Sequence, residues 1–179
     1  MNNFLLKDII DEDFTNYKKP SMFIATSKCT FKCEKEDCKV QCQNSKIVKQ
    51  PTIEISIDKI IQRYINNDIT HAVVIGGLEP IDQIDELLNF IKEFRKYSLD
   101  DIVIYTGYTE EEVSSFLYAD NKSILEAILE MNRLPSKYIE EFPSIIIKYG
   151  RFKSTGDKKY DEILGIELAS ANQYAKIYN

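Results

Sequence analysis

The chain has 179 residues, of which 44% are hydrophobic and 29% are charged, and its formal net charge is −6. This length and composition suit a soluble globular protein, and we expect a single domain over residues 1–179. The acidic balance leaves no basic stripe that would track phosphates, so no nucleic-acid partner is expected. No apolar run approaches the length of a membrane helix and the first residues lack the pattern of a signal peptide, so we expect no membrane contact and a cytoplasmic location.

The first predicted strand leads directly into a segment that contains all the cysteines. Residues 21–26 (SMFIAT) form a short apolar run typical of a strand. Residues 28–50 are polar, rich in lysine and aperiodic, so we expect a loop that is ordered by what it binds. Residues 56–67 then space their apolar side chains like one face of a helix.

The second half of the chain alternates strands with helices. A buried strand is predicted over 71–77, an amphipathic helix over 81–97 and a third strand over 101–107. Residues 109–117 predict a helix that starts with a capping box. The remaining elements are expected to be a helix over 123–132, a strand over 144–150, a polar hairpin-like loop over 154–161 and a last strand over 163–173.

This alternation is typical of a parallel sheet with crossover helices, an α/β fold. Polar and glycine clusters follow directly after four of the strands: the cysteines, Gly76-Gly77, Tyr105-Thr106-Gly107 and Gly150-Arg151. In a parallel sheet or barrel, such loops meet at the carboxyl ends of the strands, where active sites are found. We therefore expect these residues to gather in space.

The four cysteines lie within fourteen positions, at Cys29, Cys33, Cys38 and Cys42. Such crowding in a chain expected to be cytosolic favours a metal over disulfide bonds. Thiolates are preferred ligands of both iron–sulfur clusters and structural zinc. The spacing C-x3-C-x4-C-x3-C differs from the paired C-x2-C of zinc knuckles and favours a cluster, with a structural zinc knuckle as the alternative.

The sequence GGLEP lies between the second strand and its helix. Gly76 and Gly77 would let backbone groups approach a ligand closely, and the Glu79 carboxylate could receive an ammonium group. The alternative is a simple tight turn, with Glu79 in solvent and Pro80 starting the helix.

In this order, the motifs resemble the radical S-adenosylmethionine superfamily and, more narrowly, the small activating enzymes of anaerobic ribonucleotide reductase. The superfamily pattern is C-x3-C after the first strand followed by a GGEP-like motif after the second. The further matches are Cys42-Gln43-Asn44, Tyr105-Thr106-Gly107, Tyr149 to Phe152 and Ala169 to Gln173. Together the matches run in family order from about residue 21 to residue 174.

The resemblance implies an incomplete parallel (βα) barrel, smaller than the eight-stranded form, with a [4Fe-4S] cluster and S-adenosyl-L-methionine at its top rim. Cys29, Cys33 and Cys42 would hold the cluster and leave one iron open. The family spacing is C-x3-C-x2-C, so Cys42 is assigned through the Gln43-Asn44 that follows it, and Cys38 would be free or an alternate ligand.

The resemblance also implies the cofactor contacts. Gly76, Gly77 and Glu79 would hold the methionine ammonium, although Leu78 lengthens the motif by one residue. Tyr105, Thr106 and the Asn172-Gln173 pair would contact the nucleoside. Arg151 would pair with a carboxylate or with the partner.

The implied activity is reductive cleavage of S-adenosylmethionine to a 5′-deoxyadenosyl radical, which takes a hydrogen atom from a glycine of the partner. That partner would be a glycyl-radical enzyme, the large subunit of an anaerobic ribonucleotide reductase, and the electron would come from a reductant such as flavodoxin. The alternatives are a radical enzyme acting on a small molecule and a non-enzymatic zinc- or cluster-binding module.

Overall fold

The computed structural model of the protein describes residues 3–36, 42–133, 143–154 and 157–179. Its centre is a seven-stranded sheet with the order β3-β1-β2-β4-β5-β6-β9. These strands are β1 (Asn3–Asp13), β2 (Ser21–Thr26), β3 (Ile53–Ser56), β4 (Ala72–Gly77), β5 (Asp101–Tyr105), β6 (Ile145–Tyr149) and β9 (Tyr174–Tyr178). A separate hairpin pairs β7 (Lys159–Asp161) with β8 (Ile166–Leu168).

The described helices are α1 (Lys32–Glu36), α2 (Ser45–Val48), α3 (Ile57–Ile65), α4 (Ile84–Phe94), α5 (Glu110–Ser115) and α6 (Ile124–Arg133), with 3₁₀ turns η1 (Pro80–Gln83) and η2 (Ala119–Asn121). Of these, α3 to α6 fall close to their predicted positions. The predicted helix over 81–97 is therefore a 3₁₀ turn followed by α4. Within the described residues, no helix is both long and apolar enough to cross a membrane.

Strands β2, β4, β5 and β6 are parallel neighbours and form the middle of the sheet. Their near-continuous apolar sequences reflect burial on both faces. Strands β1, β3 and β9 pair antiparallel at the two sides. The sheet as a whole is therefore mixed, and the predicted parallel arrangement describes its central part.

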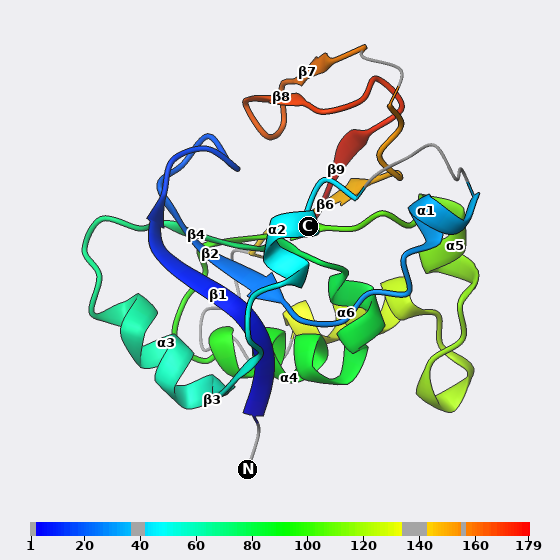
Figure 1. Ribbon diagram of the computed structural model, residues 1–179. Coiled ribbons are helices and arrows are strands. Elements are labelled where there is room, and N and C mark those ends of the chain that lie inside the picture. Colours follow the sequence, from blue (N-terminus) through cyan, green and yellow to red (C-terminus); the bar gives the residue numbers. More distant parts are fainter. Residues whose placement is uncertain (1–2, 37–41, 134–142, 155–156) are drawn as a thin grey trace.

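The two faces of the sheet are covered differently. Alternate residues of the central strands, such as Ile75 and Ile104, belong to a large core that they share with the buried sides of α3, α4 and α6. The residues between them, such as Val74 and Val103, pack with Leu164 and other residues around the β7–β8 hairpin. Figure 1 shows the three helices on one side of the sheet and the hairpin on the other. The hairpin side is the one that holds the cavity described below.

Three expectations about elements are corrected. Strand β1 was not predicted, because the alternation in the first residues is interrupted by register shifts after Leu6 and Ile10, and the four-residue strand β3 was not predicted either. The segment 28–50 is not entirely loop, since it contains α1 and α2. The last strand is not 163–173 but β9, because Gly165 (φ +71°) turns the chain there and leaves only β8 extended.

Candidate metal centre

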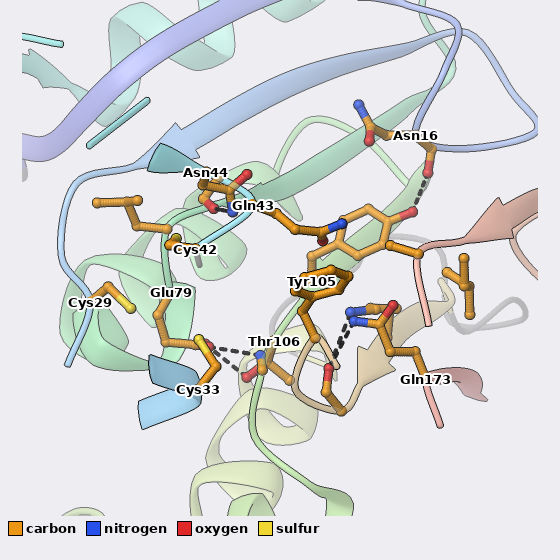
Figure 2. Close-up of a pocket in the computed structure, with 18 of the residues that line it drawn as sticks. Asn16, Cys29, Cys33, Cys42, Gln43, Asn44, Glu79, Tyr105, Thr106 and Gln173 are labelled. Carbon is orange, nitrogen blue, oxygen red and sulfur yellow. Dashed lines mark hydrogen bonds between the residues drawn. The ribbon is translucent and has the colours of Figure 1, made fainter. Parts of the chain in front are cut away.

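A cavity of about 280 Å³ opens on the hairpin side of the sheet, at the carboxyl ends of the parallel strands. Its lining comes from the ends of these strands, from the cysteine segment and from the chain around β8. The predicted site residues that line it are Cys29, Cys33, Cys42, Gly77, Glu79, Tyr105, Thr106 and Gln173. In Figure 2 the cysteines and Glu79 lie at one end, Gln173 lies at the other and Tyr105 lies between them.

The three described thiols enter the cavity from different positions. Cys29 follows β2, Cys33 lies on α1 and Cys42 precedes α2, and each is free and half-buried. In the described ranges, no three Cys, His, Asp or Glu side chains are close enough together to hold a single metal ion. Cys38, the possible alternate ligand, lies outside the described residues.

Burial disfavours deprotonation of two of these thiols, Cys29 and Cys42. It raises the pKa of Cys29 to about 12, opposed by the Phe31 N–H, which donates to the Cys29 Sγ at 3.2 Å. Burial also raises the pKa of Cys42. A buried thiolate needs nearby positive charge, which a bound metal supplies when it displaces the thiol protons. Three half-buried thiols facing one cavity thus fit a thiophilic metal group.

Glu79 is buried rather than solvated, so the simple-turn alternative is wrong for this residue. Its carboxylate accepts hydrogen bonds from Thr106 Oγ1 (2.7 Å), the Gly107 N–H (2.8 Å) and the Ile81 N–H (3.1 Å). Burial raises the pKa of Glu79 to about 7, and these hydrogen bonds oppose the shift. The GGLEP and YTG motifs are thereby joined through one carboxylate that lines the cavity.

The two glycines of GGLEP differ in role. Gly77 has φ +83°, and a Cβ there would lie 2.8 Å from the Ala25 Cα, so both conformation and space require glycine. The Gly77 carbonyl lines the cavity end and accepts a hydrogen bond from the Asn44 side chain. Gly76 lies behind the cavity wall, and its carbonyl accepts from Thr26 Oγ1 at 3.0 Å.

The residues predicted to contact a nucleoside are only partly brought together. Tyr105 lines the cavity, with its hydroxyl donating to the Asn16 carbonyl, and Thr106 lines it beside Glu79. Asn172 lies outside the lining and donates to the Arg151 carbonyl at 2.9 Å. Its neighbour Gln173 lines the cavity instead and donates to the Gly150 carbonyl at 3.1 Å.

Arg151 pairs with a carboxylate of the chain itself. Its two terminal nitrogens donate to the Glu112 carboxylate at 2.9 and 2.6 Å, and Lys32 Nζ of α1 lies 3.3 Å from the same carboxylate. Glu112 also completes the predicted capping box with Thr109. This ion pair therefore connects the cysteine-bearing helix α1 to α5 and to the segment after β6.

Lys148 is a cavity residue that sequence reasoning missed. It is 8% exposed, and within the described part of the chain its Nζ donates to the Gly150 carbonyl alone, at 3.3 Å. No acidic side chain forms an ion pair with it among the described residues. Burial lowers its pKa to about 8. The sequence could have indicated this position, because Lys148 lies two residues after Ile146 in a predicted strand. Both side chains therefore lie on the same face of the strand, the one toward the hairpin.

The model of one protein family, described as a 4Fe-4S single cluster domain, matches residues 20–132, more than half of the chain. This range contains the three described thiols, the GGLEP motif and the YTG motif. The chain belongs to the 4Fe-4S single cluster domain family. No curated protein and no solved structure matches the chain.

Membership in the 4Fe-4S single cluster domain family supports the predicted iron–sulfur cofactor. The donor chemistry agrees, because cysteine thiolates are the usual ligands of such clusters. Cys29, Cys33 and Cys42 are the described residues that would hold the cluster, since they face the same cavity.

Proposed function

We propose that this 4Fe-4S protein is a radical S-adenosylmethionine enzyme that cleaves its cofactor reductively and generates the glycyl radical of an anaerobic ribonucleotide reductase. The observation that carries the proposal is one cavity lined by three thiols together with residues of the GGLEP and YTG motifs. A cluster held by three cysteines keeps one iron free for a further ligand.

The charges around the cavity suit a zwitterionic ligand with an attached nucleoside. Glu79 from the end of β4 supplies an acceptor for an ammonium group, and Lys148 from β6 supplies a cation. Between these strands, β5 contributes the ring of Tyr105, an aromatic surface on which a base could stack. S-Adenosylmethionine has an ammonium, a carboxylate and an adenine.

When bound, the cluster would supply the electron that breaks a carbon–sulfur bond of S-adenosylmethionine and leaves a 5′-deoxyadenosyl radical. The chain would position the reactants and limit access of water. Thr106 and the Gly107 N–H hold the Glu79 carboxylate toward the cavity, and Gly77 allows the chain to turn out of β4 close against Ala25. Burial of Lys148 leaves its ammonium poorly compensated, which favours pairing with an anionic group of a ligand.

The proposed fold class and partners belong to the same hypothesis. The four central parallel strands, with the cavity at their carboxyl ends, would correspond to the core of an incomplete (βα) barrel. The glycyl-radical partner would meet the protein at this rim. Flavodoxin, or a reductant like it, would supply the electron.

The test is anaerobic reconstitution with iron and sulfide, followed by dithionite and S-adenosylmethionine, with 5′-deoxyadenosine measured as product. We expect product that falls to background in Cys29→Ala, Cys33→Ala and Cys42→Ala and persists in Cys38→Ala. Addition of an anaerobic ribonucleotide reductase should then give an organic radical signal on the partner by electron paramagnetic resonance.

The alternatives give different results in the same assay. A cluster-loaded protein that makes no 5′-deoxyadenosine would contradict the proposal and leave a non-enzymatic cluster module. A protein that takes up zinc and assembles no cluster would point to a structural zinc module. Cofactor cleavage without radical transfer to any glycyl-radical enzyme would favour a small-molecule substrate.

A further inference from the structure

The segment that carries Cys29 is attached to the turn after the GGLEP glycines by several hydrogen bonds. The side-chain oxygen of Gln83 accepts from the Ser27 N–H at 2.6 Å and from the Lys28 N–H at 2.9 Å. The Asp82 carboxylate accepts from the Thr30 N–H at 2.6 Å. The backbone amides on both sides of Cys29 are thus held by two adjacent side chains of η1.

These two side chains are themselves fixed. Gln83 is 1% exposed, and its side-chain amide donates to the Leu5 carbonyl of β1 at 3.0 Å. The second oxygen of Asp82 accepts from the Tyr108 hydroxyl at 2.7 Å. A side chain that is hydrogen-bonded to several different elements has little freedom to move. The segment Ser27–Thr30 is therefore attached to a rigid support.

The conformation beyond this segment places a donor on the cysteine sulfur. Phe31 has φ +54°, an unusual conformation for a bulky residue, and its N–H donates to the Cys29 Sγ at 3.2 Å. Such a conformation persists only where the surroundings impose it. The bond from Thr30 to Asp82 constrains the residue immediately before Phe31. Hydrogen bonds to cysteine sulfur are one of the factors that set the reduction potential of a cluster.

We infer that Asp82 and Gln83 are positioning residues of the iron–sulfur site, which fix the backbone around Cys29 so that its sulfur faces the cavity and receives the Phe31 N–H. This role concerns the cluster of the 4Fe-4S family and is independent of S-adenosylmethionine cleavage. It explains why a glutamine is fully buried at the start of a helix that otherwise buries apolar residues.

The first test replaces Gln83 by Met, which has a similar size and no charge but cannot accept the two backbone N–H groups. Reconstituted Gln83→Met should lose iron to a chelator about 10-fold faster than the unmodified chain, as is typical when support of a metal ligand is removed. Its reduced cluster should also show a changed electron paramagnetic resonance spectrum and a more negative midpoint potential. Gln83→Glu, which keeps the acceptor, should retain iron better than Gln83→Met.

Matched control variants distinguish a positioning role near Cys29 from a general effect of the substitution on the protein. Gln62→Met makes the same change on the exposed side of α3 and should leave iron loss and potential unchanged. Asp82→Leu should speed iron loss, because it removes the acceptors of both the Thr30 N–H and the Tyr108 hydroxyl. Its control is Asp85→Leu, where the native carboxylate also accepts from a tyrosine hydroxyl, that of Tyr118, at the surface.

The inference is overturned if Gln83→Met and Asp82→Leu match the unmodified chain in iron retention, spectrum and midpoint potential. If Gln83→Met fails to fold without metal, as measured by circular dichroism, Asp82→Leu alone decides by the same measurements. If the unmodified chain forms no 5′-deoxyadenosine, the proposed function is contradicted but this inference is not. Its measurements, which are iron loss, spectrum and midpoint potential, report on the cluster itself.

Discussion

At the scale of single residues, Lys148 is the clearest case of a side chain whose position lowers stability. Its buried ammonium has no carboxylate partner among the residues that the structure describes, and one hydrogen bond to the Gly150 carbonyl does not replace the lost hydration. A residue that is costly to bury and faces a cavity is a candidate for ligand binding.

We predict that Lys148→Met stabilises the ligand-free protein at pH 7 by about 1–3 kcal/mol and weakens S-adenosylmethionine binding. Because the folded pKa is lowered from 10.5 to about 8, the unfolded chain binds this proton more tightly. The stability difference between Lys148→Met and the unmodified chain should therefore shrink as the pH increases from about 8 to 10.5, because the other titrating groups are common to both proteins. Thermal unfolding across this pH range measures the effect, and a variant that is less stable at pH 7 would contradict it.

At the scale of elements, the pair Glu112–Arg151 connects α5 to the segment after β6. The Arg151 guanidinium, through its hydrogen bonds, holds the pKa of Glu112 at about 2, below its ordinary value of 4.5. A carboxylate with a lowered folded pKa stabilises the protein above its unfolded pKa, and this contribution is lost as the pH falls.

Glu112→Gln should therefore cost about 1 kcal/mol at pH 7, with the difference from the unmodified chain shrinking between pH 4.5 and about 2. The measurement is urea unfolding at several pH values. Glu111→Gln, on the exposed side of the same helix, is the control and should have little effect at any pH. A cost that does not change with pH would mean that the ion pair is not its source.

The elements also show what sequence patterns can and cannot predict. The capping box at Thr109 and Glu112 and the strand ending at Gly77 were predicted, because each depends on local spacing or conformation. Strand β1 was missed, because its pairing with β2 and β3 is non-local and interrupted by register shifts. The antiparallel addition of β9 beside β6 likewise depends on long-range pairing.

The residues of the candidate site were likewise predicted only in part. The convergence of the cysteines, Glu79 and Thr106 follows from the parallel strand ends, which sequence order can indicate. The supporting role of Gln83 could not be predicted, because it depends on the path of the chain between Ser27 and Thr30. Lys148 was missed, because a lysine at a strand end is ordinarily solvated.

At the scale of the whole molecule, the two faces of the mixed sheet differ in what they contain. The face under α3, α4 and α6 contains the large apolar core, whereas the opposite face opens into the cavity between the strand ends and the hairpin side. Figure 1 shows that the cysteine segment, the central strands and the hairpin approach this region from distant parts of the sequence. Our central proposal is that this cavity would hold the 4Fe-4S cluster on three cysteines, with one iron open to S-adenosylmethionine.

The most direct measurement is electron paramagnetic resonance of the anaerobically reconstituted and reduced protein, recorded with and without S-adenosylmethionine. We predict the signal of a reduced [4Fe-4S] cluster that changes when S-adenosylmethionine is added, because the open iron gains a ligand. The signal should be absent in Cys29→Ala, Cys33→Ala and Cys42→Ala. A cluster spectrum that is unaffected by saturating S-adenosylmethionine, or that survives the loss of any of these three cysteines, would contradict the account.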